Sequence, residues 1–313
     1  MFQTETPRCT DLFSAAGKVF LLGEYAVLAD KPAVVAAIEP RFEMTFEDHF
    51  SKPPHPQSPV ARLMQWAERM GATLASFELV DQHRGMGGFG GSTAEFALVY
   101  LALARENNWK RDWKTVWKLY RELMASEPVT PSGADLVAQW QGGVVFFDPS
   151  DGHCMDVWPL FDWSNLLVFS AGAIPGRKTA THEHLIHLER AQFPKGQPTV
   201  LAGLETILID GLSAIRENDG EKLGRAFDSY AQTLSEAGYE MDSAREDRLA
   251  LRKLSGVLGV KGCGAMLSDG VILLLESGSR NKGEVIRAAE ERGLKLLNDG
   301  LTCQQGVTCQ LRS

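Results

Sequence analysis

The sequence of 313 residues lacks the features that mark membrane proteins and secreted proteins. No segment approaches the roughly 18–20 uninterrupted apolar residues of a membrane span. The first ten residues, MFQTETPRCT, contain no apolar stretch of the kind found in a secretory signal. The five cysteines are scattered and odd in number, which is typical of free thiols in a reducing compartment. These absences predict a cytoplasmic protein with no membrane partner.

An excess of basic residues is also absent, because the chain has 32 Lys and Arg residues and 40 Asp and Glu residues. Its formal net charge is −8. A protein that binds DNA or RNA without sequence preference usually carries a basic excess, so nucleic acid is not an expected partner. Small anionic ligands stay compatible with this charge, since a few local groups can hold them. Apolar residues make up 44% of the chain and charged residues 23%, as in an average globular protein, and the length predicts two domains or one large one.

The sequence also lacks the Cys and His spacings that are typical of structural metal sites. Cys303 and Cys309 do not form a CxxC pair, and no companion pair accompanies them. His184 and His187 share one face of an expected helix, with His182 nearby, but no third ligand of fixed geometry goes with them. A histidine-bearing surface helix is therefore the favoured interpretation.

The two standard nucleotide motifs are missing or incomplete. The Walker pattern G-x-x-x-x-G-K-[ST] does not occur. Gly85, Gly87 and Gly90 formally satisfy G-x-G-x-x-G, but no strand ending in an acidic residue follows at about 20 residues, as a dinucleotide fold requires. A dinucleotide-dependent oxidoreductase is thus the weaker alternative, and a failure to bind NAD(P)H would remove it.

The residue pattern predicts an α+β chain in two parts. Short β-branched or alternating runs predict strands at 18–22, 33–38, 42–46, 75–80, 144–147, 165–171, 271–276 and 294–298. Apolar periodicity predicts helices at 60–70, 92–105, 112–125 and 280–292, and helical patterns continue from 179 to about 254. The turn-rich segment 148–164 sets the predicted boundary, which gives domains of 1–163 and 164–313.

A glycine-dense stretch, 84–91, stands directly before a predicted helix. Glycine lets backbone N–H groups approach a ligand closely, and a helix N-terminus adds free N–H groups and a positive dipole end. Ser92 followed by Glu95 also matches a capping box, in which both residues start the helix. The two roles are compatible. The stretch holds more glycine than a hairpin requires, which favours phosphate binding.

Two further segments carry charged residues beside glycines. Lys18 begins an apolar strand and Glu24 stands in the turn after it, and the spacing alone favours a solvated lysine and a turn glutamate. In Thr130-Pro-Ser-Gly-Ala-Asp135, Thr130 is the expected N-cap and Pro131 the first helical residue. Asp135 then lies in the first turn, where the helix dipole favours its anionic form. Such a carboxylate either stabilises the helix or orients a substrate hydroxyl.

Together these segments resemble the GHMP kinase superfamily, and most closely its mevalonate and phosphomevalonate kinases. The first family motif, Pro-Gly-Lys-(strand)-Gly-Glu-His/Tyr, is matched by Gly17, Lys18, Gly23, Glu24 and Tyr25, with Ala16 in place of Pro. The second, Gly-Leu-Gly-Ser-Ser-Ala, is similar to residues 88–94, with Gly91 in place of the first Ser. The third, Lys-x-Ser/Thr-Gly-Ala-Gly-Gly-Gly-Asp, is similar to residues 261–269, where three glycines are replaced by Met266, Leu267 and Ser268.

The resemblance implies ATP- and Mg²⁺-dependent transfer of a phosphoryl group to a small-molecule oxygen. It implies an N-terminal domain similar to ribosomal S5 domain 2, a ferredoxin-like C-terminal domain and a site between them. The residues implied in ATP binding are Gly85, Gly87, Gly88, Gly90, Gly91, Ser92 and Thr93. Lys18 and Asp135 are the implied catalytic residues, acting on the developing charge and on the acceptor oxygen. Ser92 and Glu122 are the implied Mg²⁺ ligands, with Glu127 as the alternative to Glu122.

The resemblance also implies an acceptor, which is mevalonate or phosphomevalonate, beside Glu24, Tyr25 and Thr181. Tyr25 favours phosphomevalonate, whereas the modest length and the Pro-Ser-Gly-x-Asp segment favour mevalonate. On balance the resemblance favours phosphomevalonate as the acceptor. Arg177 and Lys178 either hold an extra substrate phosphate or form a solvated turn. The alternatives are another sugar or metabolite kinase of the superfamily and a non-catalytic nucleotide-binding member, which the lost glycines of the third motif suggest. Both a monomer and a homodimer remain open.

Overall fold

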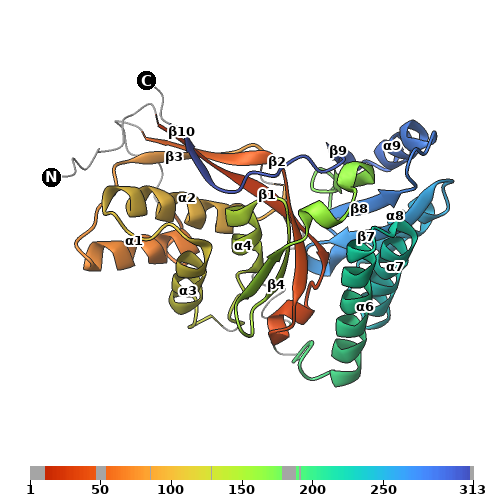
Figure 1. Cartoon of the computed structure of the whole chain (residues 1–313), viewed down its shortest axis with the longest axis horizontal. Coiled ribbons are helices and arrows are strands. Elements are labelled where there is room, and N and C mark those ends of the chain that lie inside the picture. The colour runs from red at the N-terminus through yellow and green to blue at the C-terminus, as the bar shows by residue number, and fades with distance from the viewer. Residues whose placement is uncertain are drawn as a thin grey trace.

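The computed structural model describes residues 11–46, 54–84, 86–127, 129–177, 188–189 and 192–310. They form two antiparallel sheets, each with its own group of helices, and the long strands β1 and β2 lie between the two groups (Figure 1). This is the two-part α+β architecture that the sequence predicts.

The first sheet has six strands in the order β10-β1-β2-β4-β5, with β3 also paired to β2. Its strands are β1 Leu12–Leu22, β2 Ala33–Phe46, β3 Phe77–Asp81, β4 Val144–Asp148, β5 His153–Asp156 and β10 Thr308–Gln310. The helices of this part are α1 Pro59–Arg69, α2 Gly91–Glu106, α3 Trp113–Leu123 and α4 Ala134–Gln141, and η1 Ala26–Ala29 follows β1. Helices α2 and α4 pack directly on β1 and β2, which brings both of their N-termini to the middle of the sheet.

The second sheet has four strands in the order β7-β8-β6-β9. Its strands are β6 Leu166–Ser170, β7 Val257–Cys263, β8 Gly270–Leu275 and β9 Lys295–Asp299. The helices of this part are α6 Pro198–Arg216, α7 Gly220–Glu236, α8 Asp242–Arg252 and α9 Lys282–Glu291; the short helices are η2 Trp158–Leu160, η3 Trp163–Asn165 and η4 Ala265–Leu267. Helix α7 packs tightly on β7, because a Cβ atom on Gly259 would lie 2.2 Å from the Gly224 carbonyl oxygen.

Three strands were not predicted from the sequence, and each has a physical reason. Glycines that let β7 approach α7 interrupt the apolar alternation of this strand. Strands β5 and β10 are too short, at four and three residues, to show a period. Strand β10 pairs with β1, so the range 164–313 predicted for the second domain contains a strand of the first sheet. The runs 33–38 and 42–46, predicted as two strands, form the single strand β2.

The two parts share a hydrophobic core. One cluster of buried side chains joins Val19 and Leu21 of β1 to Leu208 of α6 and Phe227 of α7. Helix α6 approaches β1 closely at Gly211, where an added Cβ would lie 2.3 Å from Leu22 Cδ1. Because this core is continuous, side chains from both parts keep fixed positions in any cleft between them.

Helix α6 is long and apolar enough to cross a membrane by length and composition, with a mean hydropathy of 1.4 over its most apolar window. In the fold it contributes Leu204 and Ile215 to the shared core, and Glu205 pairs with Lys31 of the first part at 2.8 Å. Of that window, 33% is buried in the fold, and a single such helix is weak evidence for a membrane span.

Candidate active site

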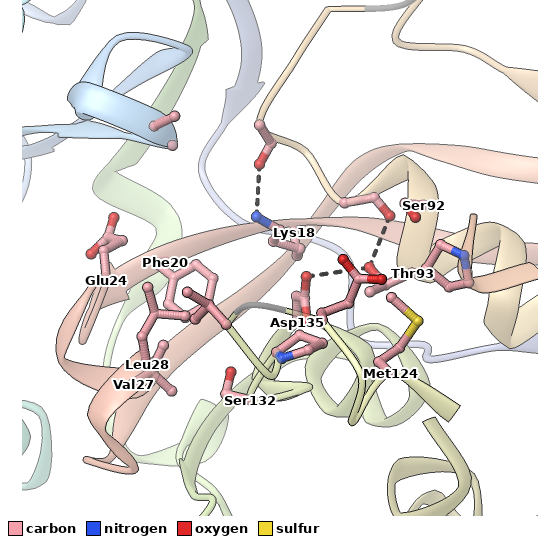
Figure 2. Close-up of a pocket in the computed structure, with 18 of the residues that line it drawn as sticks. Lys18, Phe20, Glu24, Val27, Leu28, Ser92, Thr93, Met124, Ser132 and Asp135 are labelled. Atoms are coloured by element: carbon pink, nitrogen blue, oxygen red, sulfur yellow. Dashed lines mark hydrogen bonds between the residues drawn. The ribbon is translucent and has the colours of Figure 1, made fainter. Parts of the chain in front are cut away.

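A cavity of about 530 Å³ lies where the two parts meet. Lys18 of β1 stands in it with Glu24 on one side and Ser92, Thr93 and Asp135 on the other (Figure 2). The second part contributes residues from the third motif and the segment before α6, namely Leu188, Gly264, Ala265 and Asp269. The structure thus brings residues of all three motifs to one cavity, although they are up to about 250 positions apart in the sequence.

The N-terminus of α2 opens into this cavity without a side-chain cap. Gly90 is the N-cap residue, with a φ of 85°, and Ser92 is the second helical residue. The predicted capping box of Ser92 and Glu95 is therefore wrong, because a glycine in the left-handed conformation takes the N-cap position. Among the residues that the structure describes, no side chain accepts from the first-turn N–H groups of α2, which makes them and the exposed Ser92 hydroxyl available to an anion.

Gly88 and Gly90 are required by both backbone conformation and space. Both have a φ near +85°. A Cβ atom on Gly88 would lie 2.5 Å from Asp269 Cβ, and one on Gly90 would lie 2.8 Å from Lys18 Cγ. The loop is thus held between the lysine of the first part and the aspartate of the second, and neither position has room for a side chain.

We expect Gly90→Ala to weaken ATP binding and to destabilise the fold, because it strains φ and displaces Lys18. The backbone strain alone is worth about 1–2 kcal/mol. Calorimetry with a non-hydrolysable ATP analogue and urea denaturation measure the two effects. Gly238→Ala is the matched control, since Gly238 has a φ of 82° and no atom within 4 Å of an added Cβ. Unchanged ATP affinity in Gly90→Ala would contradict the expectation.

Lys18 lies in the middle of β1, next to a register shift, rather than at the start of a strand as the sequence suggests. Its Nζ donates to the Gly88 carbonyl oxygen at 2.8 Å and lies 5.0 Å from the centre of the Phe20 ring. The residue is 8% exposed, and no carboxylate of the described residues forms an ion pair with it. A buried ammonium group without an anionic partner favours an anionic ligand.

Asp135 lies in the first turn of α4, as predicted, but the helix begins later than predicted. Gly133, with a φ of 73°, is the N-cap, so Thr130 and Pro131 precede the helix and that part of the prediction is wrong. Trp117 packs against Gly133 and donates its Nε1–H to the Ser132 carbonyl oxygen at 2.8 Å, which fixes this start. The helix therefore aims Asp135 into the cavity beside Lys18 (Figure 2).

Gln139 was missed by the sequence reasoning. It is fully buried one turn after Asp135, and its Nε2 donates to the carbonyl oxygens of Ala16 at 2.8 Å and Gly90 at 3.0 Å. Its Oε1 accepts from the Thr93 hydroxyl at 2.6 Å. One signal was present in the sequence, since a polar residue four positions after Asp135 lies on the same helical face.

Glu24 and Lys261 form a buried ion pair that joins the two parts. Lys261 of β7 is fully buried and donates to Glu24 Oε1 and, at 2.8 Å, to the Gly262 carbonyl oxygen. Glu24 Oε2 is buried without a hydrogen-bond partner among the described residues. Burial raises the pKa of Glu24, and the Lys261 ammonium opposes that rise. The sequence offered Lys261 only as a motif residue, because nothing local links it to Glu24.

Tyr25 holds the third-motif loop in place. Its hydroxyl accepts from the Met266 N–H at 2.8 Å, and its ring packs against Phe193 and Tyr239. Burial raises the pKa of Tyr25 well above its usual range, so the hydroxyl stays neutral. Met266 and Leu267 have φ values of 54° and 52°, in the left-handed region. The loop therefore keeps a glycine-like path where the family motif has glycine, at a cost of about 1–2 kcal/mol per residue.

The remaining predicted site residues differ in whether they line the cavity. Glu122 is exposed on α3 and outside the cavity, whereas its alternative Glu127 lines the cavity and pairs with Arg62. Gly91 lines the cavity, and Gly87 does not. Arg177 is buried and bound to Asp247 at 2.6 Å, away from the cavity. Outside the described residues lie Gly85, Lys178, Thr181, His182, His184 and His187.

Mg²⁺ with ATP fits the donors at this cavity better than a metal bound by protein alone. No group of three or more His, Cys, Asp or Glu side chains in the described part of the chain is able to hold a metal ion. Mg²⁺ commonly takes one or two protein oxygens and completes its shell with phosphates and waters. The Ser92 hydroxyl and the Glu127 carboxylate are such oxygens on the cavity wall.

Comparisons with known proteins agree with this fold. No family model matches the chain. The structure is similar to phosphomevalonate kinase of Streptococcus pneumoniae, with a TM-score of 0.72 and 18% identity over 92% of this chain and 98% of that one. It is also similar to mevalonate kinase of Methanococcus jannaschii, with a TM-score of 0.70 and 13% identity over 96% and 99%.

The fold is thus that of the GHMP kinases, which confirms the resemblance carried by the motifs. Among characterised sequences, the chain is similar to the mevalonate kinase of Aeropyrum pernix. The two are 26% identical over 302 residues, which cover 86% of this chain and 90% of the relative. The chain is therefore similar in fold and in sequence to GHMP-type kinases of the mevalonate pathway.

Proposed function

We propose that this protein is an ATP- and Mg²⁺-dependent kinase that phosphorylates a small-molecule acceptor of the mevalonate pathway. The observation that carries the proposal is the meeting of Lys18, Asp135 and the uncapped N-terminus of α2 in one cavity. A phosphoryl transfer needs positioning and charge stabilisation more than covalent chemistry, and these groups supply both. The similarity to a mevalonate kinase over most of both chains supports the same reaction class.

Each residue has a role that its surroundings favour. The first-turn N–H groups of α2 bind ATP phosphate oxygens, and Lys18 stabilises negative charge that develops on the transferred group. Asp135 accepts a hydrogen bond from the acceptor hydroxyl and orients its oxygen for attack. Mg²⁺, which Ser92 and Glu127 would hold, supplies further neutralisation of phosphate charge.

The charges around the cavity favour mevalonate as the acceptor. Among the described lining residues, Lys18 is the only Lys or Arg, whereas four are carboxylates: Glu24, Glu127, Asp135 and Asp269. The Arg177 guanidinium, which the sequence offered together with Lys178 for an extra phosphate, is bound to Asp247. The Tyr25 hydroxyl accepts from the Met266 N–H. Glu24 Oε2 suits a hydroxyl donor. An acceptor without a phosphate group therefore fits these surroundings better.

5-Phosphomevalonate is the second candidate acceptor. The Gly-Glu-Tyr segment at 23–25 favours it, and a solved phosphomevalonate kinase complex with phosphomevalonate and AMPPNP has a similar fold, with a TM-score of 0.70. Apart from Lys18, the described part of the cavity wall has no Lys or Arg that would hold its phosphate.

An acceptor panel tests the proposal directly. Purified protein with ATP and Mg²⁺ is assayed for ADP release with mevalonate, 5-phosphomevalonate, galactose and homoserine. We expect turnover with mevalonate at the highest kcat/KM and loss of turnover when EDTA removes Mg²⁺. A higher kcat/KM with 5-phosphomevalonate than with mevalonate would make 5-phosphomevalonate the proposed acceptor. ATP binding without turnover of any acceptor would favour the non-catalytic alternative.

A further inference from the structure

The Thr93 hydroxyl stands among three hydrogen-bond acceptors. Its Oγ1 lies 2.6 Å from Gln139 Oε1, 3.0 Å from the Gly90 carbonyl oxygen and 3.4 Å from Asp135 Oδ2. A hydroxyl carries one proton, so it donates to one of the three at a time. Which acceptor receives the proton decides whether Asp135 Oδ2 is already occupied or open to the cavity.

The side-chain amide of Gln139 settles the direction of that proton. Its Nε2 faces the carbonyl oxygens of Ala16 and Gly90, so the reverse orientation would bring an amide oxygen against two carbonyl oxygens. Gln139 is fully buried, and an unfavourable orientation there has no solvent to compensate it. Gln139 Oε1 therefore points at Thr93 and needs its proton. The Gly90 carbonyl oxygen already accepts from the Ala94 N–H and from Gln139.

We propose that Gln139 is a positioning residue that draws the Thr93 hydroxyl proton away from Asp135 and so leaves Asp135 Oδ2 open to the acceptor hydroxyl. Asp135 Oδ1 accepts from the Leu136 N–H at 3.0 Å, which leaves Oδ2 as the oxygen that faces Thr93. The inference rests on the proposed function, because it assigns Asp135 Oδ2 to an acceptor hydroxyl. It adds a residue to the site that the motifs do not contain.

The test uses Gln139→Leu with and without Thr93→Val. In Gln139→Leu the Thr93 hydroxyl is free to donate to Asp135 and competes with the acceptor, so we expect kcat to fall about tenfold, as for the loss of one charge-assisted hydrogen bond. Thr93→Val in the same chain removes the competing proton, and kcat should recover by several-fold. A kcat for the double variant at or below that of Gln139→Leu would overturn the inference, because a packing role predicts a further loss.

Three controls distinguish a positioning role of Gln139 from a general effect on folding. Gln141→Leu, an exposed residue of the same helix, should leave kcat unchanged. The affinity of Gln139→Leu for an ATP analogue should fall less than its kcat. An equal loss of both would indicate instead that Gln139 mainly holds the glycine loop through the Gly90 carbonyl oxygen. In its neutral form Gln139→Glu keeps an acceptor oxygen for Thr93 and one of the two donors, whereas its ionised form has no donor for the Ala16 and Gly90 carbonyl oxygens. Its kcat relative to wild type should therefore rise as the pH falls. A flat ratio would oppose the proposal.

A measurement without turnover distinguishes failure of this inference from failure of the proposed function. Nuclear Overhauser contacts of the Thr93 hydroxyl proton, measured at low temperature, report whether it points to Gln139 or to Asp135. Contacts to Asp135 in the wild-type protein would overturn the inference whatever the activity. Contacts to Gln139 in a protein that phosphorylates no acceptor would uphold the geometry and reject the proposed function.

Discussion

Lys18→Met is expected to lower kcat by about 10²–10³-fold, the usual loss for one donor that stabilises transition-state charge. Methionine keeps the length of the side chain and removes only the ammonium group. That group donates to the Gly88 carbonyl oxygen, beside the loop and helix N-terminus that would hold the phosphates. Its attraction strengthens as charge develops on the transferred group, so kcat should fall far more than the affinity for ATP.

Steady-state kinetics and calorimetry with an ATP analogue measure the two quantities. The melting temperature of Lys18→Met should not fall, because the substitution removes a buried charge that has no carboxylate partner among the described residues. Lys118→Met, on the exposed face of α3, is the control and should retain wild-type kinetics. A kcat within a few-fold of wild type would exclude Lys18 from catalysis.

Lys261→Met is expected to destabilise the fold by about 3–5 kcal/mol, the usual cost of removing one partner of a buried ion pair. Lys261 is fully buried, and without it the Glu24 carboxylate has no cation within ion-pair distance among the described residues. The pair also joins β7 to the turn after β1, so its loss should loosen the contact between the two parts. Urea denaturation measures the change.

The loss in Lys261→Met should depend on pH in a defined direction. Burial raises the pKa of Glu24, and removing Lys261 removes the group that opposes this rise. A carboxyl group whose pKa is higher in the folded than in the unfolded state binds more protons when folded, so stability falls as the pH rises through that range. The variant should therefore be less destabilised at pH 5 than at pH 8.

Two further variants sharpen this prediction. Glu24→Gln combined with Lys261→Met removes the buried charge and should recover part of the lost stability, though not acceptor binding. Lys222→Met breaks an exposed ion pair with Glu217 and should leave the melting temperature nearly unchanged. Equal stability of Lys261→Met and wild type would show that the pair does not hold the two parts together.

Much of the candidate site was predictable because its signals are local. Glycines before a helix, a Gly-x-Asp segment and a lysine in an apolar strand each occupy neighbouring positions, and the structure brings all three to one cavity. Helix starts were predicted less well, since Ser92 and Thr130 are good N-cap residues in isolation. Gly90 and Gly133 take those positions because Lys18 and Trp117 crowd them, which the local sequence does not reveal.

By itself, the sequence determined the two-part α+β fold, the superfamily resemblance and the segments that form the cavity, because period, turn chemistry and motif order act over short distances. Only the tertiary structure decided three partnerships: Gln139 with Thr93, Lys261 with Glu24, and Tyr25 with the Met266 N–H. These residues are from 46 to 241 positions apart. Buried polar groups need hydrogen-bond partners, and the packing of the folded chain determines which distant residue lies close enough to be the partner.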